Sequence, residues 1–262
     1  MVDINIDLIK ELRNATGVSI MQCKKALEEA GGDLEKAKIV LTKKSGEIAA
    51  KKGDRTLGAG KIVISGDDNK SIILELACET DFVANNEEFK ALANSLSEKI
   101  LNENLENANE NEEVKTAVTE AVQKMGERIE IVRYEIIDGN LGTYVHSNGA
   151  FGSVVVFEGE ANEELKKDIA MHIAAQNPKY LSNDDISEDE RNKAKETLEE
   201  EVADKPAEMQ EKILEGKMNA FFKERVLLSQ GFIKDPNQTI ESLLNNAGVK
   251  IVKFVRFGVG EE

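Results

Sequence analysis

Few side chains in this sequence are suited to covalent or metal chemistry. It holds two cysteines, Cys23 and Cys78, and two histidines, His146 and His172. Neither pair has the CxxC or HxxxH spacing that gathers ligands around zinc, so we expect no metal site. Cys78 and His146 could form a nucleophile–base pair, and their spacing leaves that arrangement open. No serine lies in a nucleophile elbow, and no acidic pair has a supporting motif.

The surroundings of these four residues favour structural roles. Cys78 ends an apolar run and Cys23 lies on the apolar face of a predicted helix, so both are expected to be buried thiols. His172 also lies on the apolar side of a predicted helix and is expected to be a hydrogen-bonded core residue. His146 lies at a strand end beside a turn and is expected to be exposed. We therefore predict a non-enzymatic interaction protein without a cofactor.

Composition narrows the class of partner. The 262 residues carry a formal net charge of -16. Binding to nucleic acid or to an anionic membrane is driven by clusters of Lys and Arg, so this balance argues against both. The first residues lack the basic and apolar regions of a signal peptide, and no apolar run reaches membrane-spanning length. We expect a cytoplasmic protein whose partner is another protein.

One stretch joins a strand to a helix and could present side chains outward. Residues 71–77 form an apolar run of strand length, and apolar residues recur at helical spacing from Phe89 onward. Thr80 suits the N-cap position, and Asp81 suits the positive end of the helix dipole. The local pattern favours Phe82 as a core side chain, because a Phe is usually buried. The alternative is that Asp81 and Phe82 are presented to a partner.

The N-terminal fifty residues predict three short helices joined by tight turns. Gly17 suits the end of the first helix, and Ser19 with Gln22 forms a capping box for the second. Asp33 is expected to cap the third helix. A module of this size is marginal alone and suits a docking unit. Residues 45–60, rich in Lys and small residues, predict a linker.

After this linker, a pattern of strands and helices occurs twice. The first half predicts a strand hairpin, two helices and a closing strand at 128–137. The second predicts a hairpin that turns at Asn148-Gly149, a helix at 163–176 and a last strand at 249–259. We expect an α+β fold with two related subdomains, each a small antiparallel sheet covered by helices.

A charged stretch interrupts the second half. Residues 183–217 are mostly charged, with acid outnumbering base, and Pro206 splits the run. Apolar residues on both sides of the split predict two antiparallel helices that project as a hairpin. The expected domains are 1–54 for the helical module, 55–139 for the first subdomain, and 140–262 for the second, with the hairpin inserted at about 183–226.

Six motifs together point to a family. In chain order they are Leu12-Arg13-x-x-Thr16-Gly17, Met21-x-Cys23-Lys24-Lys25-Ala26-Leu27, Thr80-Asp81-Phe82-Val83, Gly126-Glu127, Met171-His172-Ile173-Ala174-Ala175 and Phe254-x-Arg256-Phe257-x-Val259-Gly260. In this order and at these spacings they resemble bacterial translation elongation factor Ts, the guanine-nucleotide exchange factor for elongation factor Tu. The likeness covers essentially the whole chain. One departure is Gly231, where the family pattern leads us to expect proline.

The resemblance implies where the partner is contacted. The N-terminal module looks similar to ubiquitin-associated domains and is expected to dock on the partner's nucleotide-binding domain through Lys10, Arg13, Ile20 and Met21. The exchange tip is expected to comprise Thr80, Asp81, Phe82, Val83, Met125, Gly126 and His146. Asp81 and Phe82 match the family's intruding pair beside the partner's magnesium site. Phe82 is accordingly expected to be exposed in the free protein and buried in the partner.

The resemblance also implies a function. The protein would bind elongation factor Tu in its GDP-bound and nucleotide-free forms and promote GDP release by disturbing the Mg²⁺ and phosphate site, so that GTP can rebind. The second subdomain would grip the partner's third domain, and the helical hairpin would correspond to the family's coiled-coil arm. Some relatives carry a further C-terminal helical module, whose contacts we expect to be missing or replaced. On the residues alone, two alternatives stay open: an enzyme using Cys78 and His146, and a scaffold that leaves nucleotide affinity unchanged.

Overall fold

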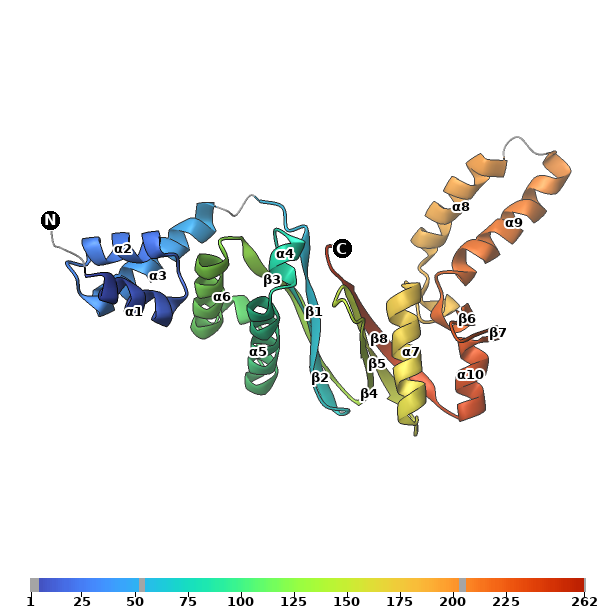
Figure 1. Cartoon of the computed structure of the whole chain (residues 1–262). Helices are drawn as coiled ribbons and strands as arrows, with labels where there is room; N and C mark the ends of the chain where they lie inside the picture. Colours follow the sequence, from blue (N-terminus) through green and yellow to red (C-terminus); the bar gives the residue numbers. More distant parts are fainter. Residues whose placement is uncertain (1–4, 52–54, 203–205, 262) are drawn as a thin grey trace.

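The computed structural model describes residues 5–51, 55–202 and 206–261. Figure 1 shows an extended arrangement in which three N-terminal helices, a first sheet with its helices and a second sheet with its helices follow one another. The C-terminal end of the chain lies between the two sheets, and a pair of helices projects from the second half (Figure 1). The fold is α+β, as the sequence predicts.

The N-terminal module consists of α1 (Ile6–Thr16), α2 (Ile20–Glu29) and α3 (Leu34–Lys51) around a small core of its own. The predicted cap residues are confirmed, but the Ser19–Gln22 capping box is not complete, because the Gln22 side chain accepts from the Ser19 hydroxyl (2.7 Å). Gly17 has a φ of 69° and ends α1, the Ser19 side chain accepts from the N–H of Gln22, and Asp33 Oδ1 accepts from Lys36 N–H at 3.0 Å.

The predicted linker at 45–60 is wrong at its start. Helix α3 continues to Lys51, and the first strand already begins at Ala59. Lys, Glu and Ala residues in this segment favour a helix, and the buried Ser45 hydroxyl bonds back to the Leu41 carbonyl at 2.8 Å. Part of the predicted linker, residues 52–54, lies outside the described residues.

The first sheet is antiparallel, with the order β1 (Ala59–Gly66), β2 (Lys70–Cys78) and β3 (Ile129–Asp138). Helices α5 (Glu87–Glu103) and α6 (Glu112–Met125) pack on one face and form the larger core with β2 and β3. Between β2 and α6 the sequence predicts one helix, but the structure has two, α4 (Asp81–Ala84) and α5. The single turn α4 ends at Asn85, and Asn86 caps α5.

The second sheet repeats this arrangement, with the order β4 (Asn140–Val145), β5 (Phe151–Glu158) and β8 (Lys250–Gly258). Its core forms with α7 (Glu163–Gln176) and α10 (Ile240–Ala247). The other faces of the two sheets share a buried cluster formed by Ile62, Ile73, Ile137, Leu141, Val154 and Phe257. Both faces of β2 are therefore covered, which explains its continuous apolar run.

A short hairpin was not predicted. Strands β6 (Gly231–Phe232) and β7 (Asp235–Thr239) pair before α10. A side chain on Gly231 would bring its Cβ within 2.8 Å of the Pro236 carbonyl oxygen, so this close pairing favours glycine at the position where we expected proline.

The projecting pair of helices is α8 (Glu188–Val202) and α9 (Ala207–Lys223), which form a hairpin as predicted (Figure 1). At its base, Ile186, Ala194, Phe222 and Val226 form a buried cluster. Within the described residues, no helix is long and apolar enough to cross a membrane.

Candidate functional site

The junction between β2 and α4 presents an exposed aromatic side chain. Thr80 has extended backbone angles and its hydroxyl accepts from the N–H of Val83 at 3.4 Å, so it is the N-cap that the sequence predicts. Phe82 is 85% exposed in the first turn of α4, and Asp81 beside it is also exposed. We call residues 80–83 the α4 tip. The local expectation of a core Phe is wrong, and the exposure that the family resemblance implies is confirmed.

The Glu127 carboxylate, which the sequence indicates only as part of the Gly126-Glu127 motif, holds this tip in place. Glu127 Oε2 accepts from the N–H groups of Glu79 (3.1 Å) and Thr80 (3.0 Å), and Oε1 accepts from Thr80 Oγ1 at 2.6 Å. In return, Glu79 Oε1 accepts from the Arg128 N–H at 2.7 Å. Hydrogen bonds to charged carboxylates are stronger than neutral ones, so these bonds fix the tip against the start of β3.

The end of α6 is thereby brought beside the α4 tip. Gly126 has a φ of 76° and caps α6, and Met125 before it is half-buried against the first core. Lys124 forms a 2.6 Å ion pair with Glu88 in the first turn of α5. Met125, Gly126 and the α4 tip therefore belong to one connected surface region.

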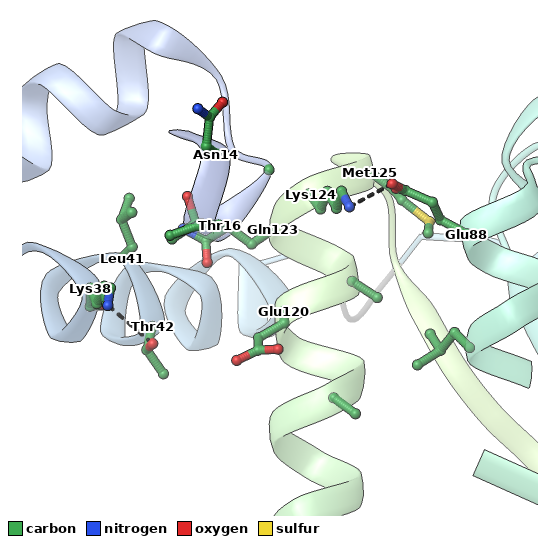
Figure 2. Close-up of a pocket in the computed structure, with 15 residues that line it drawn as sticks. Asn14, Thr16, Lys38, Leu41, Thr42, Glu88, Glu120, Gln123, Lys124 and Met125 are labelled. Carbon is green, nitrogen blue, oxygen red and sulfur yellow. Dashed lines mark hydrogen bonds and ion pairs between the residues drawn. The ribbon is translucent and has the colours of Figure 1, made fainter. Parts of the chain in front are cut away.

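The N-terminal module contacts this region through a glycine. A Cβ on Gly17 would lie 2.5 Å from Cε of Lys124, so the lysine stem lies directly against the loop between α1 and α2. A cavity of about 560 Å³ lies between the module and α6. Figure 2 shows the Lys124–Glu88 pair beside Met125, and it shows Thr16 of α1 among the other residues that line the cavity. The loop that leads to α2 is thus anchored next to the end of α6.

The four residues that the resemblance implies for docking are all exposed. Ile20 and Met21 lie in the first turn of α2 and are 59% and 64% exposed. Arg13 lies in the last turn of α1, and Lys10 one turn earlier forms an exposed ion pair with Asp7 at 3.8 Å. All four lie on α1 and α2 of the N-terminal module, whereas the α4 tip belongs to the first subdomain.

His146 lies in the turn between β4 and β5 and is exposed, as predicted. Its Nδ1 lies 2.8 Å from Asn148 Oδ1, which also accepts from the N–H of Ala150. The Lys61 ammonium joins this turn to α4 by donating to the Asn148 carbonyl (2.5 Å) and to Asn85 Oδ1 (3.0 Å). The structure therefore brings His146 close to the C-terminal end of α4.

The cysteines and the second histidine have structural environments. Cys78 is fully buried and donates to the Thr80 carbonyl at 3.2 Å, and burial raises the pKa of its thiol to about 12. Cys23 is also buried. His172 is buried as predicted, with Nε2 2.9 Å from Gln230 Oε1 and Nδ1 accepting from Ile233 N–H. Among the described residues, no group of His, Cys, Asp or Glu is arranged to hold a metal ion.

This environment predicts that Cys78 resists alkylation. The thiolate is the reactive species, and a thiol with a pKa of about 12 forms almost none at pH 8. Iodoacetamide at pH 8 should leave Cys78 unmodified in the folded protein for hours and modify it within minutes in 6 M guanidinium chloride. Mass spectrometry of the peptide measures both. Rapid labelling of the folded protein would show that the thiol is accessible and would revive a nucleophilic role.

One comparison with known proteins agrees with this arrangement. The family model described as elongation factor TS matches residues 79–261. The match begins at the β2–α4 junction, and it includes the α4 tip, the end of α6, the His146 turn and the second subdomain with its helical hairpin. It covers more than half of the chain. The chain belongs to the elongation factor Ts family, whose members are nucleotide exchange factors for elongation factor Tu and not enzymes.

Proposed function

We propose that the α4 tip drives nucleotide exchange by entering elongation factor Tu beside its Mg²⁺ and phosphate site. The observation that carries this proposal is the 85% exposure of Phe82 on a turn that Glu127 holds by three hydrogen bonds. An exposed Phe on a fixed turn can be buried in a partner without a large ordering cost. Asp81 would rearrange polar groups at the same place, with Met125, Gly126 and His146 as neighbouring contacts.

The effect on GDP affinity follows from thermodynamic reciprocity, because this protein and GDP are both ligands of elongation factor Tu. If this protein binds nucleotide-free elongation factor Tu more tightly than the GDP-bound form, it must weaken GDP binding by the same factor. Burying one Phe is worth roughly 1.5–3 kcal/mol, which corresponds to about ten- to a hundredfold. The factor needs no covalent step and no cofactor of its own, and GTP can rebind when it leaves.

Other parts of the chain would supply affinity. Lys10, Arg13, Ile20 and Met21 would dock the module, taken as residues 1–54, on the nucleotide-binding domain of the partner. The first subdomain (55–139) would carry most of the tip. The second (140–262) would grip the partner's third domain, and the α8–α9 hairpin would act as a coiled-coil arm.

We place this activity in the cytoplasm, without nucleic acid or membrane as a ligand. The net charge of -16 supports the absence of nucleic-acid and membrane ligands, because it disfavours binding to phosphate-rich surfaces. The partner forms bound would be GDP-loaded and nucleotide-free elongation factor Tu. A scaffold that only docks would bind the same partner but leave the rate of GDP release unchanged.

A saturation experiment separates docking from exchange. Release of a fluorescent GDP analogue from elongation factor Tu is followed by stopped flow at increasing concentrations of this protein. Met21→Ser removes an exposed apolar contact from the module. We expect it to raise the half-saturating concentration by about three- to tenfold and to leave the maximal rate unchanged, because the α4 tip is intact.

Ile39→Ser is the matched control. Ile39 is 68% exposed on α3 of the same module and is not one of the predicted contacts. It should shift the half-saturating concentration by less than about twofold. Equal effects of the two substitutions would contradict docking through the start of α2, and a parent protein that does not accelerate release at all would contradict the proposed function.

A further inference from the structure

A polar cavity beside the α4 tip has an unusual lining for so acidic a protein. It has a volume of about 300 Å³ and lies between β1, the end of α4, α5 and the His146 turn. The residues around it are Lys61, Ile62, Val63, Asn85, Lys90, Asn94, Val145, His146, Ser147, Asn148 and Gly149. None of these is acidic, although acids outnumber bases by 50 to 34 in the chain.

Lys61 is the more deeply buried of the two cations that line this cavity. It is only 9% exposed, and its ammonium donates to two neutral oxygens, those of Asn148 and Asn85. A buried lysine is normally paired with a carboxylate, because burying an uncompensated charge is costly. Within the described residues, Lys61 forms no ion pair. Burial lowers the pKa of Lys61, and the charge of Lys90 lowers it further.

The second cation of the cavity already has a partner. The Lys90 ammonium forms a 2.8 Å ion pair with Glu87, which lies one turn earlier on α5 and does not line the cavity. The remaining polar lining consists of amides, a hydroxyl, backbone groups and His146. The cavity therefore offers one uncompensated positive charge surrounded by neutral polar groups. A single negative charge of small size matches it.

We propose that this cavity receives a carboxylate side chain of elongation factor Tu, for which Lys61 is the counter-ion. The inference rests on the proposed function, because the cavity lies between the end of α4 and His146, where the partner would be seated. A protein carboxylate fits better than a free phosphate, since one lysine balances one charge while a phosphate dianion would leave a second charge unpaired.

Carbodiimide cross-linking tests the chemistry directly, because it joins a carboxylate to an amine only where the two are in contact. The reagent is added to the complex of the full chain with nucleotide-free elongation factor Tu, and products are identified by mass spectrometry. We expect a Lys61 product with an Asp or Glu of the partner in the complex and none in the free protein. The Lys90–Glu87 product should form in both, and it serves as the internal control.

Affinity measurements use three matched variants. Lys61→Met should weaken the complex by at least about tenfold and make its dissociation constant less sensitive to salt, because an ion pair is lost. Lys90→Met, whose charge is already paired, should change it by less than about twofold. Asn85→Ala removes one hydrogen bond to Lys61 and keeps the charge, so it should also have little effect if Lys61 acts through a partner carboxylate rather than as a brace.

The outcomes distinguish this inference from the function on which it rests. Equal affinities of the Lys61→Met and Lys90→Met variants, or the absence of a Lys61 product while Lys90–Glu87 forms, would overturn the cavity proposal. An Asn85→Ala variant as weak as Lys61→Met would assign Lys61 to bracing and overturn it as well. If the parent protein accelerates GDP release in the same experiments, the proposed exchange function stands whichever result is found.

Discussion

Phe82→Ala is expected to lower the maximal rate of GDP release from elongation factor Tu by about ten- to a hundredfold and to leave the free protein as stable as the parent. The side chain is 85% exposed, so its removal opens no cavity. We expect the free energy of unfolding to change by no more than about 0.5 kcal/mol. The loss of rate reflects the roughly 1.5–3 kcal/mol that burial of a Phe in the partner would contribute.

The measurement is stopped-flow release of a fluorescent GDP analogue at saturating factor, with urea unfolding as the stability check. Phe82→Leu keeps most of the apolar volume and should fall between the parent and Phe82→Ala. Ile39→Ala, at another exposed apolar site (68% exposed) on α3, should keep the maximal rate. A maximal rate unchanged in Phe82→Ala would remove the intruding role from this residue, even if the complex still forms.

The same side chain shows how far local pattern could predict the site. Residues that decide a single turn were assigned correctly, such as Thr80 and Ser19 as N-caps and Gly17 at the end of α1. These caps depend on neighbours within three or four positions, which a sequence displays. The exposure of Phe82 cannot be predicted from such neighbours, because the local pattern favours a buried Phe in the first turn of a helix. It was predicted only through the family resemblance.

The roles of Glu127 and Lys61 could not be predicted from the sequence, because both depend on polar contacts between distant parts of the chain. Glu127 accepts from backbone groups 47 and 48 positions earlier, and Lys61 donates to a carbonyl 87 positions later. No periodicity marks a carboxylate or an ammonium for such a role. The β6–β7 hairpin was missed for a different reason. Its first strand has two residues, and Pro236 interrupts the second, so the pattern is too short and irregular to indicate strands.

A buried ion pair of the first sheet also forms hydrogen bonds to the end of the last strand of the second sheet. Glu75 on β2 is 1% exposed, and its Oε2 lies 2.8 Å from Arg133 Nε on β3. Its Oε1 accepts from the N–H of Gly260, which follows β8 of the other sheet. The Arg133 guanidinium donates to the Gly258 carbonyl at 2.9 Å and lies over the Phe257 ring. One carboxylate and one guanidinium thus connect the sheets beside their shared apolar cluster.

Arg133→Met is therefore expected to destabilise the protein by about 3 kcal/mol or more, because it leaves the Glu75 carboxylate buried without its cation. Lys253→Met is the control. It removes the cation of the Lys253–Glu135 pair (2.9 Å), which joins β8 to β3, but both of these groups are about half exposed. It should cost less than about 1 kcal/mol. Urea unfolding gives the change in the free energy of unfolding for both variants. Hydrogen exchange of the Gly260 amide reports whether its bond to Glu75 is weakened.

The double variant Glu75→Met with Arg133→Met separates two causes of that loss. If the cost of Arg133→Met comes mainly from an uncompensated buried charge, removing the carboxylate as well should restore much of the lost stability, since paired charges can be replaced by apolar groups of similar volume. If the cost comes from the lost bond to Gly258 and the contact with Phe257, the double variant should be no more stable than the single one. We expect recovery of more than half, because Glu75 is the more deeply buried member and the second apolar side chain would extend the neighbouring cluster of Ile73 and Phe257.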